Sequence, residues 1–125
     1  MPENALLIFT GYSPDQVRLE GESRAWTLSA ERARKCEYAV LCYNANSEYS
    51  DEPVGNGEGY LVGIIAGVVP SREVEGRWCV RFSQVAKISK PNLWPGNQMP
   101  INYTSMDALG IFADELNFKA VGALD

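Results

Sequence analysis

The chain has 125 residues, of which 46% are hydrophobic and 22% charged, with a formal net charge of −5 and no histidine. That length and apolar content suffice for one core, so we expect a single domain over residues 1–125. The lack of histidine excludes the usual Ser-His-Asp and Cys-His catalytic sets and argues against a zinc site, and we expect neither a metal nor a cofactor. The acidic balance argues against bulk attraction to polyphosphate.

The cysteines and the hydropathy pattern indicate the cell compartment. Cys36, Cys42 and Cys79 form no C-x-x-C pair, and the last two fall in apolar stretches where we expect free buried thiols. Free thiols are typical of a reducing compartment, so we expect a cytoplasmic protein. No apolar run approaches the roughly 20 residues that span a bilayer, and Glu3 stands where a secretory signal would be basic, so we expect no membrane contact.

The first 44 residues predict strands around one short helix. Ser29 is a good N-cap, with Glu31 in the first helical turn and Arg34 in the last, as the helix dipole favours. The apolar or β-branched stretches on either side predict extended structure. The predicted elements are a strand at 5–10, a brief extended segment at 25–28, a helix at 30–35 and a strand at 37–44.

The middle of the chain predicts a long antiparallel strand pair. Residues 60–69 are apolar, and Gly63 and Gly67 argue against a helix because each costs roughly 1 kcal/mol relative to Ala there. Residues 77–83 alternate between apolar and polar side chains, as in a half-buried strand. Glu75-Gly76 forms a suitable turn between them. Glycines inside a strand allow the sharp bend that closes a barrel.

Loops and helical turns complete the chain. Residues 44–57 are acidic and polar and predict a loop, as do residues 91–100. The Thr104-x-x-Asp pattern predicts an N-cap and one helical turn that ends at Gly110, and residues 112–118 predict a further turn. Strands dominate this order. We therefore expect a mostly β (α+β) fold, a small β-barrel with short peripheral helices.

Three segments carry a resemblance to a known family. They are Arg24-Ala-Trp-Thr-Leu-Ser with the helix and the Tyr-Ala-Val-Leu-Cys-Tyr-Asn strand after it, Gly59-Tyr-Leu-Val-Gly-Ile-Ile-Ala-Gly-Val-Val, and Arg77-Trp-Cys-Val-Arg-Phe with a later Trp94-x-Gly. Together they resemble the PUA-like superfamily, closest to its EVE and ASCH branches, over residues 10–103. The resemblance implies a PUA-like barrel. Two departures are Cys36-Glu37 in place of Gly-Asp and the absence of the Lys-Thr pair that catalytic ASCH relatives carry.

Aromatic and amide side chains at the ends of the predicted segments suggest a ligand pocket. Such residues suit a site that stacks a flat base and reads its edge. The resemblance puts Trp26 and Tyr43 beside the EVE-like cleft, and Arg24, Arg32 and Arg34 lie near enough to hold a phosphate. The alternative is ordinary capping of the core and a solvated helix face. The candidate ligand-binding residues are Arg24, Trp26, Tyr43, Asn44, Trp94, Asn97 and Tyr103.

Other charged residues have plainer interpretations. Arg77 and Arg81 share one face of a predicted strand, which we interpret as exposed decoration more than as a basic stripe. The acidic side chains at 48–58 fit a solvated loop, although carboxylate clusters can also bind a cation weakly.

Three classes of function follow from these patterns. The leading hypothesis is a non-enzymatic module that holds a nucleobase, modified nucleotide or nucleotide-derived ligand, with RNA or single-stranded or flipped DNA as possible partners. The second is an acidic protein-interaction or inhibitor module that covers a partner's basic surface, as the charge of −5 would suit. The third is a small ASCH-like amidohydrolase, for which Lys35, Thr27 and Glu37 are the scattered candidates.

Overall fold

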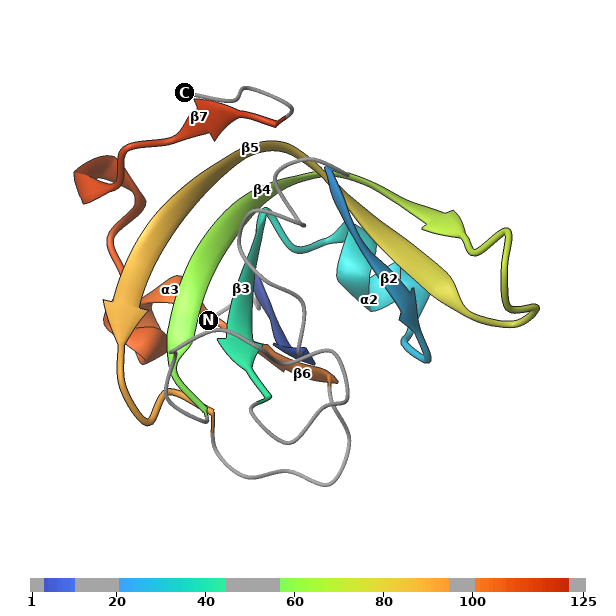
Figure 1. Ribbon diagram of the computed structural model, residues 1–125, viewed down its shortest axis with the longest axis horizontal. Coiled ribbons are helices and arrows are strands. Elements are labelled where there is room, and N and C mark those ends of the chain that lie inside the picture. Colours follow the sequence, from blue (N-terminus) through green and yellow to red (C-terminus); the bar gives the residue numbers. More distant parts are fainter. Residues whose placement is uncertain (1–3, 11–20, 45–56, 95–100, 122–125) are drawn as a thin grey trace.

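The computed structural model describes residues 4–10, 21–44, 57–94 and 101–121, except for the side chains of Arg24 and Ala25. The elements in chain order are β1 (Ala5–Thr10), β2 (Glu22–Trp26), α2 (Ala30–Arg34), β3 (Tyr38–Tyr43), β4 (Gly59–Pro70), β5 (Trp78–Lys90), β6 (Ile101–Thr104), α3 (Met106–Leu109), the 3-10 helix η1 (Ala113–Glu115) and β7 (Lys119–Ala120) (Figure 1).

The strands form one open, mixed sheet in the order β2-β5-β4-β3-β1-β6, and β7 pairs with β5 outside this path. β1 and β3 run parallel, and the remaining pairs are antiparallel. Figure 1 shows β4 and β5 arching over β3, with α2 beneath the arch. The prediction of a mostly β, α+β fold with short helices is confirmed, and the described pairings form an open sheet with β2 and β6 as outer strands.

Alternation along the strands divides the core into two clusters. Leu6 and Ile8 of β1 belong to a cluster that includes Ala33 of α2, whereas Leu7 belongs to a cluster that includes Met106 of α3. Because neighbouring strand residues point to opposite faces, each face of the sheet is covered by a different helix. We call these the α2-side cluster and the α3-side cluster.

β4 and β5 form the predicted long antiparallel pair in the interior of the sheet, and the glycines of β4 have different roles. A Cβ atom on Gly63 would lie 2.6 Å from a ring carbon of Phe82, which is buried, so this glycine lets the Phe82 ring lie directly against β4. Gly67 follows register shifts of the β4–β5 pair at Ile64/Ile65 and Ile65/Gly67, and a Cβ there would meet no atom within 4 Å. The register shifts mark bulges, which bend a strand and increase its twist.

The helix caps agree with the sequence at one end of the chain and differ by one residue at the other. Ser29 accepts a hydrogen bond from the Arg32 N–H at 3.3 Å and caps α2 as predicted. The predicted cap at Thr104 is wrong: Ser105 caps α3 by accepting from the Ala108 N–H at 3.1 Å. Thr104 is instead the last residue of β6, where it pairs with β1.

The remaining differences concern short strands. β2 begins at Glu22, so the predicted extended segment at 25–28 starts three residues too late, and Leu28 lies outside the strand. The two-residue β7 was not predicted; Lys119 and Ala120 pair with Val85 and Gln84 of β5. Gly110 does end α3 in the left-handed conformation, with φ 69°.

Candidate functional site

Three of the seven predicted ligand-binding residues, Tyr43, Asn44 and Trp94, come together at one end of the sheet. The Gly57 N–H donates to the Tyr43 carbonyl at 2.7 Å, and the Gly57 carbonyl accepts from the Trp94 N–H at 3.0 Å. The Asn44 N–H donates to the Thr10 carbonyl at 2.9 Å, where β1 ends. The backbone therefore joins Tyr43 and Trp94 through Gly57, and ties Asn44, the next residue after Tyr43, to the end of β1.

The aromatic rings at this end serve the core. Tyr43 is 1% exposed and makes an edge-to-face contact with Tyr60, with ring centroids 5.8 Å apart. Trp94 stacks on Phe9 at 4.9 Å with an interplanar angle of 8°. Tyr43 thus has no open face for a base, and Phe9 covers one face of Trp94.

Trp26 lies away from this group. It pairs with Trp78 of β5, which pairs in turn with Pro70 at the end of β4, whereas the N–H of Tyr43 bonds to Glu58 beside the start of β4. The expectation that Trp26 and Tyr43 border one cleft is therefore not met, because the register places them at opposite ends of β4. Trp26 packs against the α2-side cluster.

Tyr103 joins the edge strand β6 to the start of α2. Its hydroxyl accepts a hydrogen bond from the Ser29 N–H at 2.9 Å, and the Arg32 guanidinium lies 3.9 Å from its ring centroid. Arg32, a candidate for phosphate binding, is thus stacked on a neighbouring ring. The Arg24 side chain and the whole of Asn97 lie outside the described residues, and their roles stay predictions.

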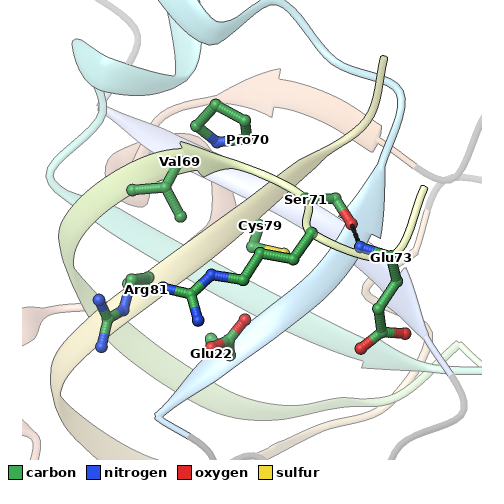
Figure 2. Close-up of a pocket in the computed structure, with 8 residues that line it drawn as sticks. Glu22, Val69, Pro70, Ser71, Glu73, Cys79 and Arg81 are labelled. Carbon is green, nitrogen blue, oxygen red and sulfur yellow. Dashed lines mark hydrogen bonds between the residues drawn. The ribbon is translucent and has the colours of Figure 1, made fainter. Parts of the chain in front are cut away.

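A second candidate site, not predicted from the sequence, consists of three hollows that all border Val69 of β4. We call them the Val69 hollows. The first has a volume of about 260 Å³ and lies between β2, β5 and the turn after β4 (Figure 2). The second, of about 320 Å³, lies between α2 and β4, and the third, of about 210 Å³, lies over Ala66 and Gly67 beside β5. Val69 is 37% exposed, so each of the three hollows has this apolar side chain on its border.

Arginines from three elements line these hollows. Arg34 comes from α2, Arg72 from the turn after β4 and Arg81 from β5, against Glu22 and Glu73 as the acidic lining residues. In a chain with a net charge of −5, this is a local excess of positive charge. Arginine presents a planar fork of N–H donors that matches phosphate or carboxylate oxygens.

Arg34 is held in place before any ligand binds. Its Nη2 donates to the Val68 carbonyl at 3.0 Å, and its guanidinium lies 5.3 Å from the Trp78 ring centroid. β3 pairs with β4 only as far as Ile64, so Arg34 contacts a stretch of β4 that β3 does not cover. A side chain ordered in advance loses less entropy when it binds.

Figure 2 shows Cys79 near the middle of the first hollow, with Arg81 and Glu73 toward opposite ends and Glu22 across from Val69 and Pro70. Cys79 is 5% exposed and forms part of the floor. Ser71 shapes the turn, because its Oγ accepts from the N–H groups of Glu73 and Val74, each at 3.2 Å. The hollow is thus mixed in charge and closed on one side by an ordered turn.

The sequence could have suggested Arg34 and Arg81 as site residues, but not the other residues that line the hollows with them. The sequence marks Arg34 as a candidate for phosphate binding and predicts Arg81 as decoration of an exposed strand face. The hollow around Arg81 depends on β2 pairing with β5 and on the bulges of β4, and both result from tertiary structure. A glycine inside a strand, Gly67, was the one signal of a bulge.

The buried titratable groups belong to the core. Burial raises the pKa of the Cys42 thiol to about 12, and burial, with smaller contributions from Cys42 and Tyr43, raises the pKa of Tyr60. The three cysteines are buried and form no disulfide bond, as predicted for Cys42 and Cys79. None of these groups is arranged as an exposed nucleophile.

The scattered amidohydrolase candidates are at the surface. Lys35 lies 3.9 Å from Glu31 one turn earlier on the same segment, with both side chains largely exposed. Thr27 and Glu37 are exposed as well. Over residues 4–10, 21–44, 57–94 and 101–121, no three Cys, Asp or Glu side chains are grouped to hold a metal ion.

Comparison with known proteins gives no assignment. The chain matches no protein-family profile. It also matches no curated protein and no solved structure. In the described part of the chain, none of the helices has the length and apolar character needed to cross a membrane.

Proposed function

We propose that this chain is a PUA-like, non-enzymatic binding module that holds a nucleotide-derived ligand at the Val69 hollows. The observation that carries the proposal is that Arg34, Arg72 and Arg81 line hollows that all border Val69, in a chain that is acidic as a whole. A phosphate is the group that such a set of guanidinium forks recognises best. The Trp segment, short helix and glycine-bearing strand that resemble PUA-like domains support the same class.

The shape of the site favours a small ligand over a long duplex. Each hollow has a volume of about 210 to 320 Å³, and the three share Val69 as an apolar contact. A ligand that spans them would place a ring in one hollow and a phosphate near an arginine of the next. Of the three arginines, Arg81 alone lines two of these hollows, the first and the third, so we expect it to affect binding most.

Titration calorimetry with a panel of nucleoside monophosphates and diphosphates tests the proposal. Losing one charge-assisted contact costs about 1.5–3 kcal/mol, so Arg81→Ala should weaken binding about 10- to 150-fold. Lys87→Ala is the matched control, because Lys87 is exposed on the same strand and lines none of the three hollows. The proposal is wrong if no nucleotide binds at millimolar concentration, or if both variants weaken binding equally.

A further inference from the structure

We infer that the first Val69 hollow selects a guanine-type base, with Glu22 as the specificity-determining residue. This inference rests on the proposed function and names the ligand class of the same site. Glu22 is the first residue of β2, and its Cα is directly paired with that of Arg81 on β5. Directly opposed residues of an antiparallel pair have Cβ atoms roughly 5 Å apart on one face of the sheet.

Both charged groups are available to a ligand. Glu22 and Arg81 line the same hollow, and among the described residues neither side chain makes a hydrogen bond or an ion pair. Glu22 is half-buried, whereas Arg81 is exposed. A carboxylate acceptor on β2 and a guanidinium donor on β5 thus come from directly paired positions and line the same hollow (Figure 2).

The size of the hollow suits a flat bicyclic ring. Its volume is about 260 Å³, whereas a buried cavity of roughly 150 Å³ is known to accept benzene. Val69 and Pro70 supply apolar contacts on one side, and the ordered turn that begins at Ser71 borders the hollow next to them. A purine fills this space better than a single six-membered ring does.

The chemistry of the two side chains distinguishes among purines. A carboxylate has two oxygens and accepts two parallel N–H donors, just as it accepts the arginine fork. Guanine presents N1–H and its 2-amino group next to each other, with O6 beside them, whereas adenine presents only its 6-amino group. Glu22 accepts from N1–H and the 2-amino group, and Arg81 donates to O6 or N7.

Calorimetric titration of the full chain with GMP, IMP and AMP tests the inference. IMP keeps O6 and N1–H but lacks the 2-amino group, so one charge-assisted hydrogen bond is lost. We expect GMP to bind about 10- to 150-fold more tightly than IMP, and AMP to bind no more tightly than IMP. In Glu22→Gln the preference for GMP over IMP should fall to within about 3-fold, because a neutral amide oxygen is a weaker acceptor and its amino group repels a donor.

Glu73→Gln is the matched control, since Glu73 lines the same hollow but lies toward the end away from Arg81. This variant should keep the wild-type preference for GMP. If the three nucleotides bind with similar affinity, or if Glu22→Gln keeps the full preference, the inference is overturned while the proposed function stands. If none of the nucleotides binds, both are overturned.

Discussion

Tyr103 and Ser29 are 74 residues apart in sequence, yet the Tyr103 hydroxyl accepts a hydrogen bond from the Ser29 N–H at 2.9 Å. The contact fixes the N-terminal end of α2 to the outer strand β6, and the Arg32 guanidinium 3.9 Å above the ring strengthens it. An isolated helix as short as the five-residue α2 would not persist. Its persistence therefore depends on such tertiary contacts.

Tyr103→Phe should lower the free energy of unfolding by about 1–3 kcal/mol, because it keeps the ring under Arg32 but removes two hydrogen bonds to Ser29, one accepted from its N–H at 2.9 Å and a longer one donated to its carbonyl at 3.4 Å. Urea denaturation with an unchanged m-value is the measurement. Tyr38→Phe serves as the control, since the Tyr38 hydroxyl bonds to none of the described residues while its ring packs against Phe118. Equal losses in both variants would contradict a structural role for the Tyr103 hydroxyl.

The two glycines of β4 make a matched pair for the next prediction. Gly63→Ala places a Cβ 2.6 Å from the Phe82 ring, so we expect it to cost about 1–3 kcal/mol of stability. Gly67→Ala adds a methyl group in open space, so stability should stay constant or rise by about 0.4–1 kcal/mol. Chemical denaturation of both variants checks this. Phe82→Leu in the Gly63→Ala background should recover part of the lost stability. If the stability losses of the two single variants simply add in the double variant, the contact between Gly63 and Phe82 is refuted.

Local patterns in the sequence predicted the strands and caps that depend on neighbouring residues. Ser29 is followed by a helix with Glu31 early and Arg34 late, and the structure has that cap. Thr104 and Ser105 are both good N-cap residues. Ser105 caps α3 because Thr104 is paired with Ala5 of β1, and no local pattern in the sequence contains that pairing. The mostly β class could be predicted, because alternation and β-branched residues are local patterns. The position of β2 beside β5 could not, because it depends on long-range pairing.

The candidate site was less predictable because burial is a tertiary property. Tyr43 ends a strand in the sequence and looked free to stack, but Tyr60 from the next strand covers it. Arg81 looked like decoration because its neighbours at the hollow, Glu22 and Ser71, come from a distant strand and from a turn. A pocket formed by long-range pairing leaves little trace in local composition.

Cys42 gives a prediction for the alkaline range. Burial raises the pKa of its thiol from 9.0 to about 12, so the folded state resists ionisation more than the unfolded chain does. This contribution to stability is complete below about pH 9 and is lost as the pH rises toward 12, at about 1.4 kcal/mol per pH unit. Between pH 8 and pH 10 the free energy of unfolding, measured by denaturation, should fall less in Cys42→Ala than in the wild type. Identical pH slopes would contradict it.

Plain duplex DNA should not bind this chain. The net charge is −5, and affinity for duplex without sequence preference comes from neutralised phosphates along a basic face. We expect no micromolar binding to a random duplex at about 150 mM salt, measured by fluorescence anisotropy. The Val69 hollows bring together three arginines, too few to overcome the charge of the whole molecule at that salt concentration. A micromolar Kd for random duplex would show that this electrostatic argument fails.

A variant of Trp26 distinguishes a ligand in the aromatic pocket that the sequence suggests from a ligand at the Val69 hollows. The Trp26 Nε1–H donates to Ser23 Oγ at 2.9 Å, and Ser23 is 1% exposed, so the indole supports the edge of β2 as well as the α2-side cluster. Trp26→Phe keeps most of the apolar contact but leaves a buried hydroxyl without this donor, which should cost about 1–3 kcal/mol. Thermal melts measure that cost, and nucleotide titration of the folded variant should give the wild-type Kd. A wild-type melt with binding weakened about 5-fold or more would instead place the ligand on the indole, as stacking on an aromatic ring requires.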